Sequence, residues 1–122
     1  MPVGFDLIEI ERVERALERR PGLAERVFTP AELEACRARP RPGRHLAARF
    51  AAKEAALKAL GLGGMRLHEV EVVGGGEEPP RLVLHGSARR AAEEQGVELS
   101  VSLTHSRELA GAAVLAERRP PT

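Results

Sequence analysis

The sequence predicts an α+β fold in which one long central helix packs on a mainly antiparallel sheet. Apolar residues recur at the helical period through residues 44–60, which predicts the long helix. Residues 97–103 alternate between apolar and polar side chains, as a half-buried strand does. Two β-rich runs, 68–73 and 81–85, flank a glycine- and proline-rich turn and predict a hairpin. The length fits a single domain over residues 1–122.

Composition limits the classes of function. The net charge is only +1, which predicts neither a nucleic-acid partner nor a membrane partner. No apolar run approaches the roughly 20 residues that span a bilayer, and the N-terminal residues lack a signal-peptide pattern. The single cysteine, Cys36, excludes an internal disulfide and fits a reducing compartment. We therefore expect a cytoplasmic protein.

The first strand is predicted over residues 3–8, which are rich in β-forming residues. Its alternation places Gly4, Asp6 and Ile8 on one face. Asp6, the only aspartate of the chain, then lies on a partly apolar face beside a glycine that leaves room for a ligand. The alternative is that Asp6 caps the helix that follows.

That helix is predicted over about residues 10–20, ended by Pro21-Gly22. The 3.6-residue period groups three arginines on one of its faces: Arg12, Arg15 and Arg19. Such a stripe is commonly only solvated, and nearby glutamates partly neutralise it. The sharper interpretation is docking of an acidic protein partner, to which Arg26 would contribute.

A second, short helix is predicted to begin at Thr29-Pro30-Ala31-Glu32, which has the pattern of a capping box. It ends before Pro40-Arg41-Pro42-Gly43, which is predicted to be a loop. Cys36 has no histidine or second cysteine nearby in this helix, so it is assigned no metal or nucleophilic role.

The central helix holds the only two lysines of the chain, Lys53 and Lys58. Its bulky apolar residues form one stripe and its alanines fill much of the opposite side, which predicts packing on both sides. Lys53 falls within the apolar stripe and Glu54 at its edge, where charges are costly unless paired or bound. An exposed Glu54–Lys58 pair is the simple interpretation, but it leaves Lys53 unexplained.

Glycines close the central helix in the run Gly61-Leu62-Gly63-Gly64. Gly61 is predicted to be a left-handed cap. The further glycines exceed what a cap needs, and they can let the backbone approach a phosphate or a nucleotide.

Ser87 is predicted to cap a helix that runs to about Gln95. A final strand is predicted over residues 109–117, and residues 74–80 are predicted to be a flexible turn. His105 continues the inward phase of strand 97–103. A lone histidine at such a place is more often structural than a ligand, and both interpretations stay open.

Three pieces of the sequence occur in an order that resembles one enzyme family. They are GFDLIEIERV near the N-terminus, RFAAKEAALKALGLG in the middle and VSLTHSRELAGAAVL near the C-terminus. Together they resemble the holo-acyl-carrier-protein synthases, the short bacterial class of 4′-phosphopantetheinyl transferases. The resemblance covers nearly the whole chain, and FAAKEA followed by KA-x-G is its most specific part. Leu62 stands where the family often has threonine, so it is not assigned as a ligand.

The resemblance implies an enzyme with the 4′-phosphopantetheinyl transferase fold. It would move phosphopantetheine from coenzyme A to a serine of apo acyl carrier protein and release adenosine 3′,5′-bisphosphate. It also implies Mg²⁺ as cofactor, a role in fatty acid biosynthesis, and a homotrimer with active sites formed between subunits.

The resemblance further implies roles for single residues. Asp6 and Glu54 match the carboxylates that hold the metal, and Lys58 matches a lysine near the transferring phosphate. These three are the predicted catalytic residues, and the base stays open between Glu54 and a metal-bound water. The predicted coenzyme-binding residues are Arg49, Lys53, Lys58, Gly61, Gly63 and His105. Lys53 would contact phosphate or orient Glu54. Arg12 matches a position that contacts the carrier protein, which favours docking on Arg12, Arg15, Arg19 and Arg26.

Two rival functions share part of this pattern with the transferase. Another Mg²⁺-dependent phosphate enzyme would share the carboxylates and cations but would not need the arginine face. A non-catalytic module that binds coenzyme A or a carrier protein would not need a pair of metal-binding carboxylates. The joint presence of Asp6, Glu54 and Lys58 therefore favours the transferase.

Overall fold

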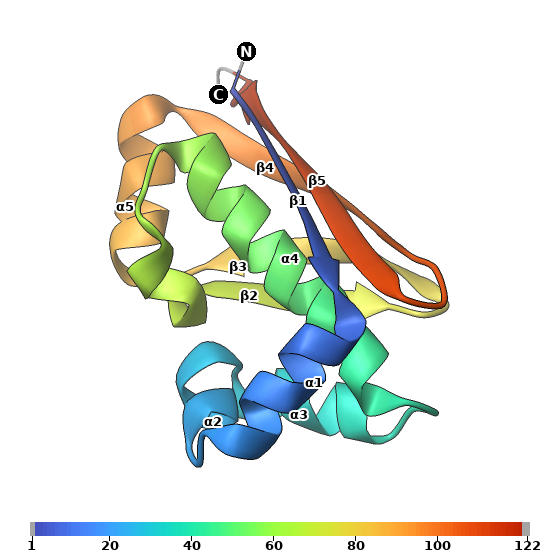
Figure 1. Cartoon of the computed structure of the whole chain (residues 1–122). Coiled ribbons are helices and arrows are strands. Elements are labelled where there is room, and N and C mark those ends of the chain that lie inside the picture. The colour runs from blue at the N-terminus through green and yellow to red at the C-terminus, as the bar shows by residue number, and fades with distance from the viewer. Residues whose placement is uncertain (1, 121–122) are drawn as a thin grey trace.

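The computed structural model describes residues 2–120, and its architecture is shown in Figure 1. A three-stranded antiparallel sheet has the order β1-β5-β4, and a separate antiparallel hairpin joins β2 to β3. The strands are β1 (Val3–Glu9), β2 (Val70–Gly75), β3 (Glu78–Leu84), β4 (Val97–His105) and β5 (Leu109–Arg118). The helices are α1 (Ile10–Arg19), α2 (Leu23–Val27), α3 (Pro30–Arg37), α4 (Pro42–Leu60), the 3-10 helix η1 (Gly64–Glu69) and α5 (Gly86–Gln95).

Helix α4 crosses the middle of the molecule, as the sequence predicts. It packs on the three-stranded sheet, chiefly on β1 and β5, and it also contacts β2 of the hairpin. Figure 1 shows α1, α2 and α3 gathered at one end of α4, with α5 beside its other end. The predicted burial on two sides is confirmed, because its alanines and its bulky residues are both buried: Leu46, Ala47, Ala48, Ala51, Ala52, Ala55, Ala56, Leu57, Ala59 and Leu60.

Small residues let β1 lie directly against α4. A β-carbon added to Gly4 would fall 1.8 Å from the carbonyl oxygen of Ala55. This close approach brings the first strand, and Asp6 two residues later, onto the middle of the helix. The predicted face of the strand is confirmed: Gly4 is buried and Asp6 and Ile8 are half-buried, whereas the alternate residues are exposed.

We expect Gly4→Ala to lower the free energy of unfolding by about 3 kcal/mol or more, since the new methyl group clashes with backbone that cannot turn aside. Chemical denaturation measures this change. Gly63→Ala is the matched control, because Gly63 has a φ of −75° and open space around it. That control should stay within about 0.5 kcal/mol of the parent. Equal stabilities of the two variants would contradict the close packing of β1.

Several boundaries differ from the sequence-based prediction. Helix α2 was not predicted, and α4 begins at Pro42 rather than Arg44, because proline suits the first turn of a helix. Thr29 and Glu32 do form the predicted capping box at the start of α3. Asp6 does not cap α1, whose N-cap is Glu9 without a side-chain bond.

The hairpin is longer and its turn tighter than predicted. Residues 74–80 were predicted to be a flexible turn, but β2 runs to Gly75 and β3 begins at Glu78, with these two residues paired. The register shifts between Val73 and Gly75, and Gly74 has a φ of +80° that favours such a bulge. The predicted strand start at residue 68 is also wrong, because residues 64–69 form η1.

Ser87 does not cap α5 as predicted. The N-cap position is His85, which makes no side-chain cap. The carboxylate of Glu69 accepts the backbone N–H groups of Ser87 and Ala88 instead, at 3.2 and 3.1 Å, and also the Ser87 hydroxyl. A distant acid, which the local sequence pattern cannot indicate, therefore satisfies the first turn of this helix.

Candidate active site

Two carboxylates and a lysine come together where β1 crosses α4. Asp6 is supplied by β1, and Glu54 and Lys58 by successive turns of α4. The Lys58 ammonium lies 3.1 Å from Asp6 Oδ1 and donates to the carbonyl oxygen of Phe5 at 3.3 Å. The simple i,i+4 pair of Glu54 with Lys58 is therefore replaced by an ion pair between elements.

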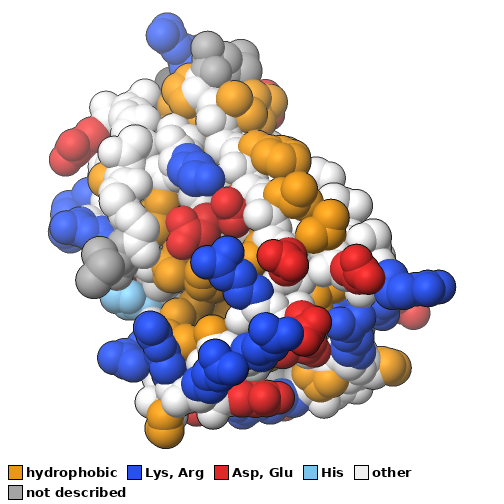
Figure 2. Space-filling view, in the orientation of Figure 1, with side chains coloured by type: hydrophobic (Ala, Val, Ile, Leu, Met, Phe, Trp, Pro, Cys, Tyr) orange, Lys and Arg blue, Asp and Glu red, His pale blue; other side chains and the backbone are white. Residues whose placement is uncertain are grey.

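Asp6 and Glu54 line one cavity of about 410 Å³ together with Arg12. The remaining lining is apolar and comes mainly from β1, α1 and α2: Leu7, Ile8, Val13, Ala16, Leu17, Leu23, Val27, Phe28 and Phe50. In Figure 2, acidic and basic side chains meet near the middle of the face shown, above a recess lined by hydrophobic side chains. The smaller cavity thus has charged side chains at its opening and an apolar interior.

The carboxyl group of Glu54 has a raised pKa. Burial is the main cause, the negative charge of Asp6 adds to it, and Lys58 opposes it. The negative charges of two carboxylates in one cavity also attract a cation.

These residues fit Mg²⁺, which proteins often hold with one or two carboxylates while substrate phosphates and waters fill the other positions. Within residues 2–120 no group of three or more His, Cys, Asp or Glu side chains could hold a metal. Asp6 and Glu54 alone would therefore be an incomplete metal site, which a phosphate ligand would complete.

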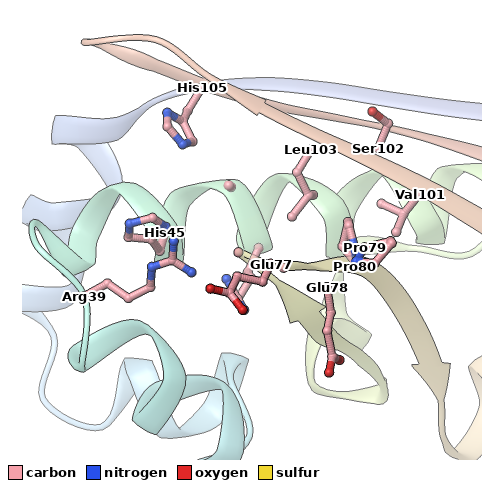
Figure 3. A pocket seen from close by; sticks show the side chains of 14 residues that line it. Arg39, His45, Glu77, Glu78, Pro79, Pro80, Val101, Ser102, Leu103 and His105 are labelled. Carbon is pink, nitrogen blue, oxygen red and sulfur yellow. The ribbon is translucent and has the colours of Figure 1, made fainter.

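A second, larger cavity of about 610 Å³ lies between the start of α4, the end of β4 and the hairpin turn. Figure 3 shows His45, Arg39 and His105 at one end, Glu78, Pro79 and Pro80 of the hairpin toward the other, and Glu77 between them. Arg49 also lines it; this side chain is 5% exposed, and its Nη2 donates to the Gly74 carbonyl at 3.0 Å. Two of the predicted coenzyme-binding residues, Arg49 and His105, therefore share one cavity.

His45 was not singled out from the sequence. It lies four residues before Arg49 on α4, so the two occupy the same face of the helix, and that spacing is the signal that could have found it. Its ring meets the ring of His105 edge to face, with 5.9 Å between the centroids. His105 is exposed on the cavity rim, which does not fit the interpretation of a structural histidine.

Lys53 lies in the interior and lines neither of these two cavities. Its ammonium is fully buried, lies 2.7 Å from Glu32 Oε1 and also donates to the Val70 carbonyl. The ring of Phe28 lies 5.5 Å from the same nitrogen. Within the described residues every hydrogen bond of the Lys53 ammonium goes to the protein itself, so its predicted coenzyme contact finds no support in this geometry and stays a prediction.

The two glycines predicted to bind coenzyme line neither cavity. Gly61 is a left-handed C-cap with a φ of +76°, and its N–H bonds to the last turn of α4. Gly63 lies in open space. The cap role predicted for Gly61 is confirmed, and the coenzyme contacts of both glycines stay predictions.

The predicted docking arginines all lie on exposed positions of α1 and α2. Arg12 reaches the rim of the smaller cavity, while Arg15 pairs with Glu11 on its own helix. Figure 2 shows Lys and Arg side chains gathered over this end of the molecule, with acidic side chains between them. Cys36 is buried, and burial raises the pKa of its thiol, as expected for a residue without a chemical role.

Known proteins give an independent comparison. The family model described as "4'-phosphopantetheinyl transferase superfamily" matches residues 2–114. A holo-[acyl-carrier-protein] synthase of Moorella thermoacetica is 50% identical over 120 residues, covering 96% of this chain and 94% of that protein. One of Geobacter sulfurreducens is 45% identical and covers 94% and 95%.

Solved structures of the same class superpose on the fold. The "Chronobacterium ammoniagenes ACPS-CoA complex" matches with a TM-score of 0.85 and 30% identity, covering 98% of both chains. A holo-[acyl-carrier-protein] synthase of Helicobacter pylori in complex with coenzyme A matches with a TM-score of 0.79 and 27% identity, covering 94% of this chain and 99% of that chain. The chain therefore belongs to the 4′-phosphopantetheinyl transferase superfamily and, within it, to the holo-[acyl-carrier-protein] synthases.

Proposed function

We propose that this enzyme transfers 4′-phosphopantetheine from coenzyme A to a serine of apo acyl carrier protein in an Mg²⁺-dependent reaction. The observation that carries the proposal is that Asp6 and Glu54 line one cavity while the Lys58 ammonium lies 3.1 Å from Asp6 Oδ1. The serine oxygen forms a bond to the phosphorus that carries pantetheine, and the bond from that phosphorus to the bridging oxygen breaks. The serine proton passes to a base, Glu54 or a water, and adenosine 3′,5′-bisphosphate leaves with the electron pair of the broken bond.

Asp6 and Glu54 would hold the metal, which supplies positive charge to the pyrophosphate as negative charge grows on the leaving group. Lys58, half-exposed beside Asp6, adds a mobile cation at the same place. Arg49 and His105 are proposed to bind the coenzyme from the larger cavity. In the comparisons, two structures similar to this chain were solved with coenzyme A, which supports that ligand.

The direct test incubates the protein with Mg²⁺, coenzyme A and an apo carrier protein known to be competent. The carrier is expected to gain the mass of one phosphopantetheine group, and adenosine 3′,5′-bisphosphate is expected to appear in equal amount. Binding of coenzyme A without any change in carrier mass would favour the non-catalytic binding module instead.

We further propose that the reaction serves fatty acid biosynthesis in the cytoplasm. Within the described residues, no helix is both long enough and apolar enough to cross a membrane.

A homotrimer is proposed from the outer face of the three-stranded sheet. The β1 residues that point away from α4 are large and exposed, with Val3 at 63%, Phe5 at 60% and Leu7 at 56%. Leu109 and Leu115 of β5 extend this face, and Val3 pairs with Leu115 in register. Figure 2 shows the resulting hydrophobic band along one edge of the molecule. Such a band is typical of a protein–protein interface, here proposed with other copies of the chain.

We expect Phe5→Glu to shift the protein to monomers in analytical ultracentrifugation and to lower transferase activity. A glutamate in an apolar interface would bury an unpaired charge, while in the monomer it is solvated. A parent protein that sediments as a monomer, or a variant that keeps the parent's oligomeric state, would contradict the proposed interface.

Docking of the carrier protein on the arginines of α1 is tested best at Arg19, because Arg12 lines the catalytic cavity. We expect Arg19→Glu to raise KM for the carrier about five- to tenfold, equivalent to about 1–1.4 kcal/mol, with kcat little changed. The effect should shrink at high salt, since exposed charges are screened. Arg90→Glu on α5 makes the same charge change elsewhere on the surface. Equal KM values for both variants would contradict docking on α1.

A further inference from the structure

The larger cavity carries a cluster of cationic side chains that the sequence motifs account for only in part. His45 and Arg49 lie one turn apart on α4, His105 ends β4, and Arg39 follows α3. Figure 3 shows the two imidazole rings at the same end of the cavity, with Arg39 next to His45. His45 belongs to none of the motifs that define the family resemblance.

Arg49 indicates the kind of ligand that the cluster takes. Among the described residues, its Nε is buried and lacks a hydrogen-bond partner. Its Nη2 bonds only to the Gly74 carbonyl. An unsatisfied buried donor costs about 1–3 kcal/mol, so a ligand that brought an acceptor to this guanidinium would offset that cost. A planar guanidinium suits a phosphate oxygen especially well.

The surroundings of His45 disfavour a charged ring in the free protein. Burial lowers the pKa of His45 most, and the positive charges of Arg39, Arg44, His105 and Arg49 lower it further. The acidic residues that line the cavity are Glu77 and Glu78 of the hairpin. In Figure 3 the Glu78 carboxylate points away from the histidines, while Glu77 extends toward Arg39.

We propose that His45 binds a phosphate of coenzyme A in its protonated form, so that coenzyme binding takes up a proton at this residue. The inference rests on the proposed function, because it takes coenzyme A as the ligand of this cavity. A phosphate brings negative charge among Arg39, Arg49 and the two histidines, which offsets the burial and the positive charges that lower the pKa of His45. The protonated ring then donates a charge-assisted hydrogen bond to a phosphate oxygen.

The direction of the pH dependence follows from this linkage. His45 is neutral in the free protein above its lowered pKa, and in the complex its pKa is raised. Affinity for coenzyme A is therefore greatest below the pKa of the free protein, and it falls as pH rises through the pKa of the complex. The window therefore opens below the ordinary histidine value of about 6.5, because the pKa of His45 in the free protein is lowered from it.

The test is an NMR titration of the four histidine rings with and without saturating coenzyme A. Single His→Gln variants assign the signals. The pKa of His45 is expected to rise by at least about one unit on binding, which corresponds to about a tenfold change in affinity between the two protonation states. His85, paired with Glu71 on the hairpin side of the molecule, is the control and should not shift.

Calorimetry adds a second readout. His45→Gln should bind coenzyme A more weakly at pH 6 and show less change in affinity between pH 6 and 8 than the parent. Dephospho-coenzyme A identifies the partner: if it still raises the pKa of His45, the pyrophosphate is bound there, and if it does not, the 3′-phosphate is.

Two results would overturn the proposal. One is a His45 pKa that stays or falls when coenzyme is bound, and the other is a His45→Gln variant with the parent's pH dependence. A parent protein that binds no coenzyme A would refute this proposal and the proposed function together. Coenzyme binding with the expected shift but without carrier modification would refute the transferase function alone.

Discussion

Glu54→Gln is expected to lower transferase kcat by at least about a thousandfold while leaving the protein folded. The substitution removes one of the two carboxylates that line the smaller cavity. A metal that stabilises developing charge is worth several kcal/mol, and about 4 kcal/mol corresponds to a thousandfold in rate. The measurement is the initial rate of carrier modification at saturating coenzyme A, with and without added Mg²⁺. Chelation of the parent's metal should cause a loss of similar size that Mg²⁺ restores.

The same variant should be at least as stable as the parent at neutral pH. Burial and the charge of Asp6 raise the pKa of Glu54 in the folded protein. Because the pKa of Glu54 is higher in the folded than in the unfolded protein, its contribution to stability is fully present below the unfolded-state pKa. That contribution is lost as pH rises through the folded-state pKa. Glutamine cannot ionise, so the variant avoids that loss.

A variant that loses activity but not stability marks Glu54 as a functional residue rather than a structural one. Glu94→Gln is the matched control, since it makes the same chemical change on an exposed position of α5. Both its rate and its free energy of unfolding should stay near the parent's. A Glu54→Gln variant that keeps most of its activity would refute the metal assignment, and one that unfolds would show that Glu54 stabilises the fold.

The periodic parts of the chain explain why so much of the fold could be predicted. Helix α4, the strands β1, β4 and β5 and the capping box of α3 each follow from patterns within a few residues. The tight hairpin turn and the role of Glu69 at α5 could not be predicted, because they depend on contacts between segments. For the same reason the spacing of Glu54 and Lys58 suggested a local pair, whereas Lys58 bonds to Asp6, 52 residues away.

The candidate site likewise contains residues that sequence motifs could identify and contacts that only the fold reveals. The family resemblance selected Asp6, Glu54, Lys58, Arg49 and His105. The fold places Asp6 and Glu54 in one cavity, with Lys58 bonded to Asp6, and it places Arg49 and His105 in another. The resemblance could not select His45, because this residue lies outside the motifs on which the resemblance depends. Nor could it reveal that Lys53, inside the motif, faces the protein interior.

Lys53→Met is expected to lower the free energy of unfolding by about 3–5 kcal/mol, the usual cost of breaking a buried ion pair. Glu32 would keep its bonds from the N–H groups of Thr29 and Val72, each at 2.8 Å, but it would lose its only recorded cation. Burial lowers the pKa of Lys53 and Glu32 opposes that shift, so each charge is tolerated through the other. The double variant Lys53→Met/Glu32→Gln should therefore be more stable than Lys53→Met alone, as chemical denaturation can measure.

Kinetics of the same Lys53→Met variant decide between a coenzyme ligand and an internal support. If Lys53 contacts a phosphate of the coenzyme, its replacement would raise KM for coenzyme A even in fully folded protein and at every temperature. A residue that ties α4 to α3 and β2 from inside should instead leave KM and kcat within about threefold of the parent once rates are normalised to the folded fraction. The structure predicts the second outcome, because the Lys53 ammonium reaches Glu32 and the Val70 carbonyl rather than a cavity. A KM for coenzyme A raised tenfold or more in fully folded protein would return Lys53 to the coenzyme site, and would require the buried pair to open when the coenzyme binds.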